Sequence, residues 1–423
     1  MTHSAPSKLT ILPTTAALTG RVMPPGSKSI TNRALLVAAL ARGTSRLSGA
    51  LKSDDTRYMA QALRDMGVAI DEPDATSFIV TSDGKLRAPA KPLFLGNAGT
   101  ATRFLTAAAA LVDGTVVVDG DEHMRKRPIL PLVQALTRLG VAITAPSGCP
   151  PVTIQGQGGF EGGLVEVDGG LSSQYVSALL MAGACARNPV DVVLTGQEIG
   201  ARGYVDLTLA TMRAFGAQVS EPESGGWRIA PTGYVATDYL IEPDASAATY
   251  LWAAEVLTGG AIDLGVPAEA FTQPDAMAHE LIAAFPNLPA QIDGSQMQDA
   301  VPTLAVLAAF NRTPVRFTGI ANLRVKECDR VAALAQGLSR IRAGLGVEEG
   351  DDLLVASDPA LAGQTLSAEI DTFADHRIAM SFALAGLKIG GVTILDPGCV
   401  AKTYPDYWRA LGSLGVRFEG EVP

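Results

Sequence analysis

The chain has 423 residues, 47% of them hydrophobic, and a formal net charge of −10. This length suits two or three domains, and the acidic balance argues against nucleic acid and anionic membranes as partners. The sequence contains no uncharged apolar run of about 18 residues and no basic leader followed by an apolar stretch, so we expect neither a membrane span nor a signal peptide.

Four cysteines and four histidines occur in the chain. The cysteines show no C-x-x-C spacing, which is typical of free, reduced thiols in a cytoplasmic protein. The histidines are not spaced as metal ligands. We therefore expect a cytoplasmic protein that binds no metal.

In chain order, an alanine-rich helix, a small turn and a β-branched strand recur six times, with the turns at Gly43, Gly114, Pro189, Gly260, Pro314 and Gly391. Successive turns lie about 70 residues apart, and the fourth interval is shorter. A repeat of this period indicates a pseudo-symmetric assembly. The alternative is coincidental glycine spacing in an ordinary α/β protein. We expect an α/β fold of six units, the fourth of them shortened, whose apolar helices are buried together inside sheets.

All six expected helices begin with polar residues, in the stretches PPGSKSITNRA, LGNAGTATRFL, GGLSSQYVSAL, EPDASAATYLW, QMQDAVPTLAV and FADHRIAMSFA. Helix capping accounts for residues such as Asp244 and Ser246. It does not account for cations, which oppose the helix dipole at this end; these are Lys28, Arg33, Arg103 and Arg377. An anion bound between the cations and the free N–H groups would remove the conflict.

Further cations follow the predicted strands: Lys52, Arg57, Arg125, Lys126, Arg127, Arg202, Arg324, Lys326, Arg330 and Lys402. A single charged loop is usually a solvated surface, but recurrence in equivalent loops favours one cleft lined with cations. Among these cations stand acid–base candidates, namely Asp299, Glu327, Asp375 and His376. Because no Walker A loop, nucleophile elbow or dinucleotide fingerprint occurs, we expect a site for phosphate and carboxylate ligands that uses neither a metal nor a cofactor.

Eight motifs in order carry a resemblance to a known family: PGSKSITNRALL, SDDT, LGNAGTATRFL, RKRPI, LSSQYVSALL, RVKECDR, DHRIAMSFALAG and AKTYPDYW. Together they resemble the 5-enolpyruvylshikimate-3-phosphate synthase family, over about Val22 to Trp408. The resemblance implies an inside-out α/β barrel of two lobes, each built from three βαβαββ units with inward helices. It places 21–239 in one lobe and 1–20 with 240–423 in the other, with the active-site cleft between them. We expect a monomer.

The resemblance also implies a reaction. The family transfers the enolpyruvyl group of phosphoenolpyruvate to the 5-hydroxyl of shikimate 3-phosphate, releasing phosphate through a tetrahedral intermediate. This step belongs to the shikimate pathway, which leads to chorismate and the aromatic amino acids. The expected partners are therefore these two small molecules.

The family motifs imply the following site residues. Shikimate 3-phosphate is expected at Lys28, Ser29, Arg33, Ser172, Ser173, Gln174, Asp299, Asn322 and Lys326. Phosphoenolpyruvate is expected at Lys28, Asn97, Gly99, Thr100, Arg127, Gln174, Arg330, Arg377 and Lys402. Asp299 is predicted to be the base at the 5-hydroxyl and Glu327 the proton carrier at the methylene carbon, assisted by Lys28 and His376.

Two positions depart from common family patterns. Ala201 stands where a serine often touches the 3-phosphate, and Arg202 is expected to offset that loss. Phe104 stands where a proline is common and is expected to affect the tilt of its helix. Gly99 leaves room for glyphosate, so we expect inhibition that is competitive with phosphoenolpyruvate.

Two alternatives remain from the sequence. A UDP-N-acetylglucosamine enolpyruvyl transferase would share the fold, but that family relies on a loop cysteine and a Lys-Asn pair. Here Lys28 is followed by Ser29, and the RKRPI loop has no cysteine. An inactive paralogue that only binds phosphorylated metabolites would not need Lys28, Asp299 and Glu327 together.

Overall fold

The structure is a computed structural model that describes residues 8–196, 201–223 and 225–423. It divides into two compact units. The N-terminal unit is Gly26–Glu242, and the C-terminal unit combines the described residues of Met1–Pro25 with Pro243–Pro423. The chain thus passes between units after Pro25 and after Glu242, where the sequence predicts passages after residues 20 and 239.

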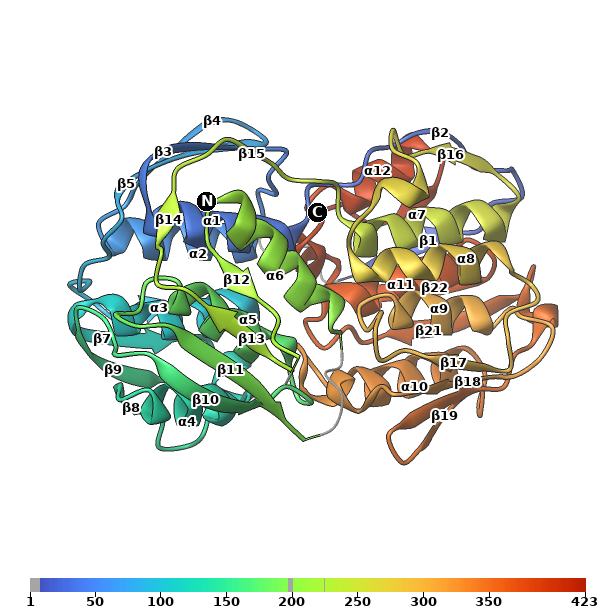
Figure 1. Cartoon of the computed structure of the whole chain (residues 1–423). Helices are drawn as coiled ribbons and strands as arrows, with labels where there is room; N and C mark the ends of the chain where they lie inside the picture. The colour runs from blue at the N-terminus through green and yellow to red at the C-terminus, as the bar shows by residue number, and fades with distance from the viewer. Residues whose placement is uncertain (1–7, 197–200, 224) are drawn as a thin grey trace. The chain divides into compact units, whose positions relative to one another are not determined.

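Helices fill the interior of the N-terminal unit. Three of them are buried along almost their whole length: α1 (Lys28–Leu40), α3 (Gly99–Ala108) and α5 (Ser173–Gly183). Their sequences are mostly apolar on every side, which is the pattern of a helix without a solvent face. Helix α3 packs against both α1 and α5 (Figure 1). The other helices are α2 (Asp54–Asp65), η1 (Ala109–Leu111), η2 (Met124–Lys126), α4 (Leu130–Arg138) and α6 (Gly203–Ala214).

The described strands of this unit form three sheets. The first has the order β14-β3-β5-β4, with β15 also paired to β3; the others run β6-β7-β9-β8 and β10-β11-β13-β12. In the first sheet β14 and β15 both pair with β3 in parallel, and the other two sheets have one parallel pair each; the remaining pairs are antiparallel. The bounds are β3 (Ala41–Ser48), β4 (Ala69–Asp74), β5 (Ser77–Asp83), β6 (Leu93–Phe94), β7 (Asp113–Asp119), β8 (Ala142–Thr144), β9 (Val152–Gln157), β10 (Gly163–Asp168), β11 (Val190–Thr195), β12 (Val219–Ser220), β13 (Trp227–Ile229), β14 (Tyr234–Val235) and β15 (Tyr239–Leu240).

The C-terminal unit repeats this plan. Its buried helices α7 (Ala245–Thr258), α9 (Val301–Ala308) and α11 (His376–Gly386) pack against one another. Around them lie η3 (Ala268–Ala270), η4 (Pro274–Met277), α8 (Ala278–Ala283), η5 (Ala321–Val325), α10 (Arg330–Ile341), η6 (Pro359–Leu361), η7 (Pro397–Lys402) and α12 (Tyr407–Ser413). The predicted cap at Asp244 is confirmed, because its side chain accepts from the N–H of Ala247 at 2.9 Å. The prediction for Ser246 is wrong, because its hydroxyl donates to Asp275 instead.

Strands from both ends of the chain meet in this unit. One sheet runs β21-β22-β1-β23, in which Lys8 lies opposite Leu395. A second runs β17-β18-β20-β19, and a third has two described strands, β16 and β2. The bounds are β1 (Lys8–Leu12), β2 (Thr19–Arg21), β16 (Ala261–Asp263), β17 (Gln291–Asp293), β18 (Val315–Thr318), β19 (Gly346–Glu349), β20 (Asp352–Val355), β21 (Thr365–Ile370), β22 (Gly390–Leu395) and β23 (Arg417–Glu419).

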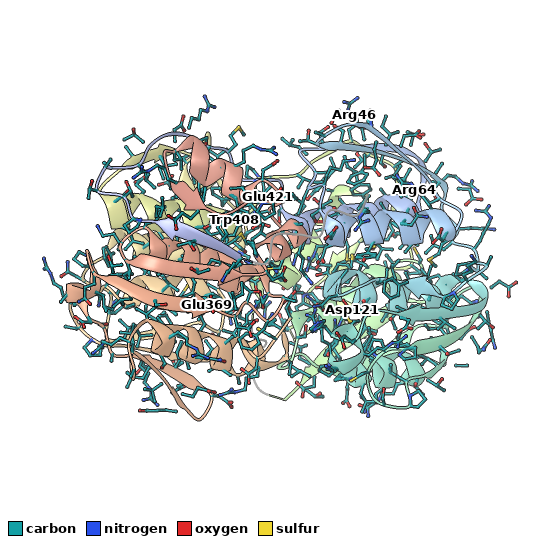
Figure 2. The ribbon with its side chains drawn as sticks, turned by 180° about the vertical axis from the view of Figure 1, so that it is seen from behind. Arg46, Arg64, Asp121, Glu369, Trp408 and Glu421 are labelled. Atoms are coloured by element: carbon teal, nitrogen blue, oxygen red, sulfur yellow. The ribbon has the colours of Figure 1, made fainter. Side chains whose placement is uncertain are left out.

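Each unit has its own hydrophobic core. Trp408 is buried within the C-terminal unit, whereas the exposed Arg46 extends outward from β3 of the N-terminal unit (Figure 2). Within the described residues, no helix has the length and apolar character needed to cross a membrane. The predicted mixed α/β class is confirmed.

Candidate functional site

Helix N-termini position most of the predicted residues of the N-terminal unit. Lys28 is the first residue of α1, behind the capping Ser27. Gly99 is the first residue of α3, and Ser172 caps α5. Ser173 and Gln174 follow Ser172, and the Gln174 amide donates to Thr100 Oγ1 at 3.3 Å, which joins the starts of α5 and α3. Free N–H groups at such ends attract anions.

Lys28 has a carboxylate partner that is not among the residues predicted from the sequence. Its ammonium lies 3.6 Å from Asp55 Oδ2, and both side chains are at least nine-tenths buried. Asp55 stands in the first turn of α2, within the SDDT motif. A buried lysine needs such a partner, because an isolated charge is costly away from water. Asp55 therefore supplies the counter-charge for Lys28 at the start of α1.

Arg33 connects helices inside the N-terminal unit. Its Nε donates to Thr208 Oγ1 at 2.7 Å, and its Nη2 donates to Ser177 Oγ and to the carbonyl of Tyr204. Burial lowers the pKa of this guanidinium to about 10. Its guanidinium also lies over the ring of Phe104, 5.2 Å from the centroid. The geometry thus assigns Arg33 a structural link between α1, α5 and α6, and direct contact with shikimate 3-phosphate stays a prediction.

Arg127 lies against the start of α3. Its Nη1 donates to Asn97 Oδ1 at 3.0 Å and to the Asn97 carbonyl at 3.3 Å. A Cβ placed on Gly99 would lie 2.7 Å from Arg127 Nη2, closer than such atoms approach in proteins. The absence of a side chain at Gly99 therefore allows the guanidinium to lie beside the helix N-terminus.

The two residues before α6 bear on a family departure. Ala201 is buried and adopts a left-handed backbone, with φ of 59°. Arg202, expected to compensate for the missing hydroxyl, lies 3.5 Å from Glu221 and over the ring of Trp227. That Arg202 offsets the missing serine hydroxyl at the 3-phosphate stays a prediction.

Arg330 is the centre of the predicted residues in the C-terminal unit. It is the first residue of α10 and 1% exposed. Its Nε donates to Asp375 at 2.7 Å, its Nη2 to Glu327 at 2.6 Å and its Nη1 to Asp299 at 3.0 Å. Burial alone would lower the pKa of Arg330, but the carboxylates, Asp375 first, outweigh burial and raise it. One guanidinium therefore fixes three carboxylates.

Two more cations extend this ionic network. Asp299 Oδ2 accepts from Arg377 Nη2 at 2.8 Å, so both of its oxygens face guanidinium groups. Glu327 Oε1 lies 3.3 Å from Lys402 Nζ. The order Lys402, Glu327, Arg330, Asp299, Arg377 alternates in charge. The cations favour the ionised forms of both carboxylates.

Three other predicted groups lie close by in sequence or structure. Asn322, in η5, is 8% exposed, and its Oδ1 is buried without a hydrogen-bond partner among the described residues. Lys326 directly follows η5 and is partly exposed. His376, the first residue of α11, is fully buried, with Nδ1 3.6 Å from Asp375 Oδ1. An assisting role for His376 stays a prediction.

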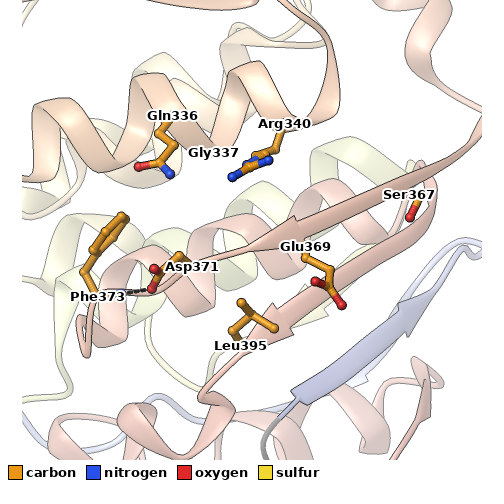
Figure 3. Close-up of a pocket in the computed structure, with 8 residues that line it drawn as sticks. All are labelled: Gln336, Gly337, Arg340, Ser367, Glu369, Asp371, Phe373 and Leu395. Carbon is orange, nitrogen blue, oxygen red and sulfur yellow. Dashed lines mark hydrogen bonds between the residues drawn. The ribbon is translucent and has the colours of Figure 1, made fainter.

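A strained turn precedes His376 and Arg377. Phe373 and Ala374 both adopt left-handed backbone, with φ of 51° and 54°. The Asp371 side chain accepts from the N–H of Phe373 at 2.8 Å, beside a groove of about 320 Å³ between α10 and β21 (Figure 3). None of the predicted site residues lines this groove. The turn aims Asp375 inward, where it caps α11 and binds Arg330.

Several of the loop cations expected to line a cleft form ion pairs with nearby carboxylates. Lys52 pairs with Glu72, Arg57 with Asp54 and Arg125 with Asp119, at 2.7, 2.7 and 2.6 Å. Arg324 binds Asp329, Glu348 and Asp351. Recurrence of charge in equivalent loops therefore overestimates the number of ligand-facing cations. Tyr250, whose hydroxyl lies 3.5 Å from Arg377 Nη1, is a neighbour not predicted from the sequence.

Comparison with known proteins decides the family. Residues 12–411 match the family model for EPSP synthase (3-phosphoshikimate 1-carboxyvinyltransferase). The chain belongs to the EPSP synthase family. It is a transferase of the shikimate pathway and of aromatic amino acid biosynthesis, with 3-phosphoshikimate 1-carboxyvinyltransferase activity. This assignment favours the family predicted from the motifs over the UDP-N-acetylglucosamine enolpyruvyl transferase.

Relatives match along essentially the whole chain. A 3-phosphoshikimate 1-carboxyvinyltransferase of Rhizobium etli is 73% identical over 99% of both chains. One from Pseudomonas syringae is 71% identical, over 96% of this chain and 98% of the relative. Among solved structures, the EPSP synthase of Acinetobacter baumannii matches with a TM-score of 0.78 at 27% identity, over 98% of this chain and all of the other.

Proposed function

We propose that the ionic network of the C-terminal unit carries out acid–base chemistry on substrates whose anionic groups the N-terminal unit helps to bind. In the addition step, the 5-hydroxyl of shikimate 3-phosphate loses a proton and its oxygen bonds to C2 of phosphoenolpyruvate, while C3 gains a proton. In the elimination step, C3 loses a proton and inorganic phosphate leaves C2. The reaction thus needs a base, a proton carrier and cations.

Asp299 is the proposed base at the 5-hydroxyl. Its side chain is 16% exposed, so a ligand can reach it, and two guanidinium groups keep it ionised. A base must be ionised to accept a proton. The alternating network around Asp299 is the single observation that carries the proposed mechanism.

Glu327 is the proposed proton carrier at C3. Its carboxylate is 6% exposed and lies between Arg330 and Lys402. The ammonium of Lys402 is 3.3 Å away and holds the Glu327 carboxylate in position. Arg377 and Lys402 would stabilise the charge that develops on the leaving phosphate.

Residues of the N-terminal unit are proposed to bind the anionic groups of both substrates. Lys28 and Arg127 supply charge, while Ser172, Ser173 and Gln174 supply hydroxyl and amide donors beside a helix start. Such donors bind phosphate without a metal. No cofactor is needed in this mechanism.

The finer architecture belongs to the same proposal. Five sheets share one plan, a parallel pair followed by antiparallel strands, and the described sheet of β16 and β2 has two strands. This recurrence supports six repeats, three in each lobe and the fourth shortened, arranged as an inside-out barrel with the active site in a cleft between lobes. We also propose a cytoplasmic monomer that binds no nucleic acid.

Phosphate release tests the mechanism. The purified protein is mixed with both substrates, and each substrate is omitted in turn. We expect release only when both are present, and a fall in kcat of at least about 100-fold in Asp299→Ala and in Glu327→Ala. Saturable binding of shikimate 3-phosphate without release would instead support a paralogue that only binds metabolites.

A further inference from the structure

Asp275, in η4 of the C-terminal unit, is a fully buried carboxylate outside the proposed ionic network. Its Oδ2 accepts from Ser246 Oγ at 2.9 Å, and its Oδ1 accepts from the N–H of Ala300 at 3.1 Å. Ser246 lies in the first turn of α7, and Ala300 caps α9 directly after Asp299. Asp275 therefore connects two helix starts, one of which holds Asp299.

The peptide group between Asp299 and Ala300 is held at both ends. Its N–H contacts Asp275 Oδ1 and also donates to the carbonyl of Met297 at 3.0 Å. Its carbonyl accepts from Arg377 Nη1 at 3.4 Å, while Nη2 of the same arginine binds the Asp299 side chain. Rotation of this peptide would move the Cα of Asp299 and turn its carboxylate away from Arg377.

The segment that contains Asp275 is itself held in place by the side chain of Gln273. Two residues earlier, the Gln273 amide donates to the carbonyl of Pro243 at 2.6 Å and accepts from the N–H of Ala245 at 3.3 Å. The Gln273 side chain therefore holds the start of α7, and the Asp275 side chain holds the start of α9. A buried carboxylate at a helix N-terminus also favours the helix dipole.

We infer that Asp275 is a positioning residue for the reaction, because it holds the main chain that carries the Asp299 carboxylate. The inference rests on the proposed role of Asp299 as the base. A displacement of about 1 Å at a reacting group can lower a rate about 100-fold, so a contact remote from the substrate can still govern kcat.

The test uses steady-state kinetics of phosphate release together with thermal unfolding. Asp275→Ala removes both acceptors, and we expect kcat to fall about 10- to 100-fold while both KM values change less than about threefold. Asp275→Asn keeps an oxygen that can accept from Ala300, and we expect kcat within about threefold of the parent. Ser246→Ala is the matched control; it leaves the Ala300 contact, and kcat should stay within about twofold.

A second variant tests the inference if Asp275→Ala fails to fold. The double substitution Ser246→Ala with Asp275→Leu replaces both hydrogen-bonding partners by apolar groups, which is often tolerated in a core. We expect it to fold and to show the same loss of kcat. Unchanged kcat in this folded variant would overturn the inference.

A double-mutant cycle separates this inference from the proposed function. If Asp275 acts through Asp299, then Asp275→Ala combined with Asp299→Ala is no slower than Asp299→Ala alone. Multiplying losses would overturn the positioning role. If Asp299→Ala alone retains full kcat, the assignment of the base fails as well, which the single variant reveals by itself.

Discussion

The guanidinium of Arg127 covers the Cα of Gly99 so closely that a Cβ there would lie 2.7 Å from Nη2. Arg127 is 7% exposed and its guanidinium is hydrogen-bonded to Asn97, so the guanidinium cannot move away without losing those contacts. The absence of a side chain at Gly99 thus allows Arg127, a predicted phosphoenolpyruvate-binding residue, to lie at this position.

Gly99→Ala should therefore weaken phosphoenolpyruvate binding more than it weakens the fold. The methyl group displaces the flexible end of Arg127 and not main chain, so we expect a stability change below about 1 kcal/mol. A weakened charged hydrogen bond predicts a KM for phosphoenolpyruvate that is about 10-fold higher. Gly412→Ala is the control, since a Cβ there meets only Phe418 at 3.7 Å. An unchanged KM in Gly99→Ala would contradict a role for Arg127 in binding.

Inhibition by glyphosate follows the same geometry. We expect glyphosate to compete with phosphoenolpyruvate in the parent protein and to inhibit Gly99→Ala less, because the added methyl group and the displaced Arg127 narrow the same space. The measurement is the inhibition constant at several phosphoenolpyruvate concentrations. Full activity of the parent protein in millimolar glyphosate would contradict the prediction of competitive inhibition.

Arg330 should be indispensable to folding as well as to activity. Arg330→Met leaves Asp299, Glu327 and Asp375 without their shared cation, and removing one partner of a buried ion pair costs about 3–5 kcal/mol. Urea unfolding should show this loss. Arg330→Lys keeps the charge but cannot hold three carboxylates with one planar fork, so we expect an intermediate stability. Equal stability of Arg330→Met and the parent would refute the central role.

The left-handed turn before Asp375 predicts a stabilising substitution. Ala374 has φ of 54°, a conformation that costs a residue with a Cβ about 1–2 kcal/mol. Ala374→Gly removes this strain but gives the unfolded chain more freedom, so we expect a gain of up to about 1 kcal/mol in unfolding free energy, with kcat unchanged. Ala374→Val should be destabilised. A loss of stability in Ala374→Gly would show that the turn is not strained.

Thiol reactivity should be low in the folded protein. Burial raises the pKa of Cys185 to about 12, and burial first, then Asp375, raises that of Cys328. Only the thiolate reacts, so very few Cys185 thiols are reactive at pH 8. Labelling with iodoacetamide, resolved by mass spectrometry, should be slow at both positions and should accelerate as pH rises. Rapid labelling at pH 8 without urea would disprove this.

Local physical chemistry determined much of the fold from the sequence. Apolar stretches behind polar first turns predicted six buried helices. The structure has a helix in each of these stretches, namely α1, α3, α5, α7, α9 and α11. Helix caps depend on residues only a few positions apart, which is why Asp244 could be identified. The ordered motifs likewise predicted the family, because each combines residue types at short spacing.

Only the tertiary structure decided which charges meet. Arg33 and Arg127 look alike in the sequence, yet the contacts of Arg33 join three helices, whereas Arg127 lies beside a helix start. Asp55 and Asp275 reach their partners Lys28 and Ala300 across 20 to 30 positions of sequence, and no short-range pattern encodes such pairs. The reason is physical: capping and periodicity act within a few residues, whereas burial and ion pairing depend on how distant segments pack.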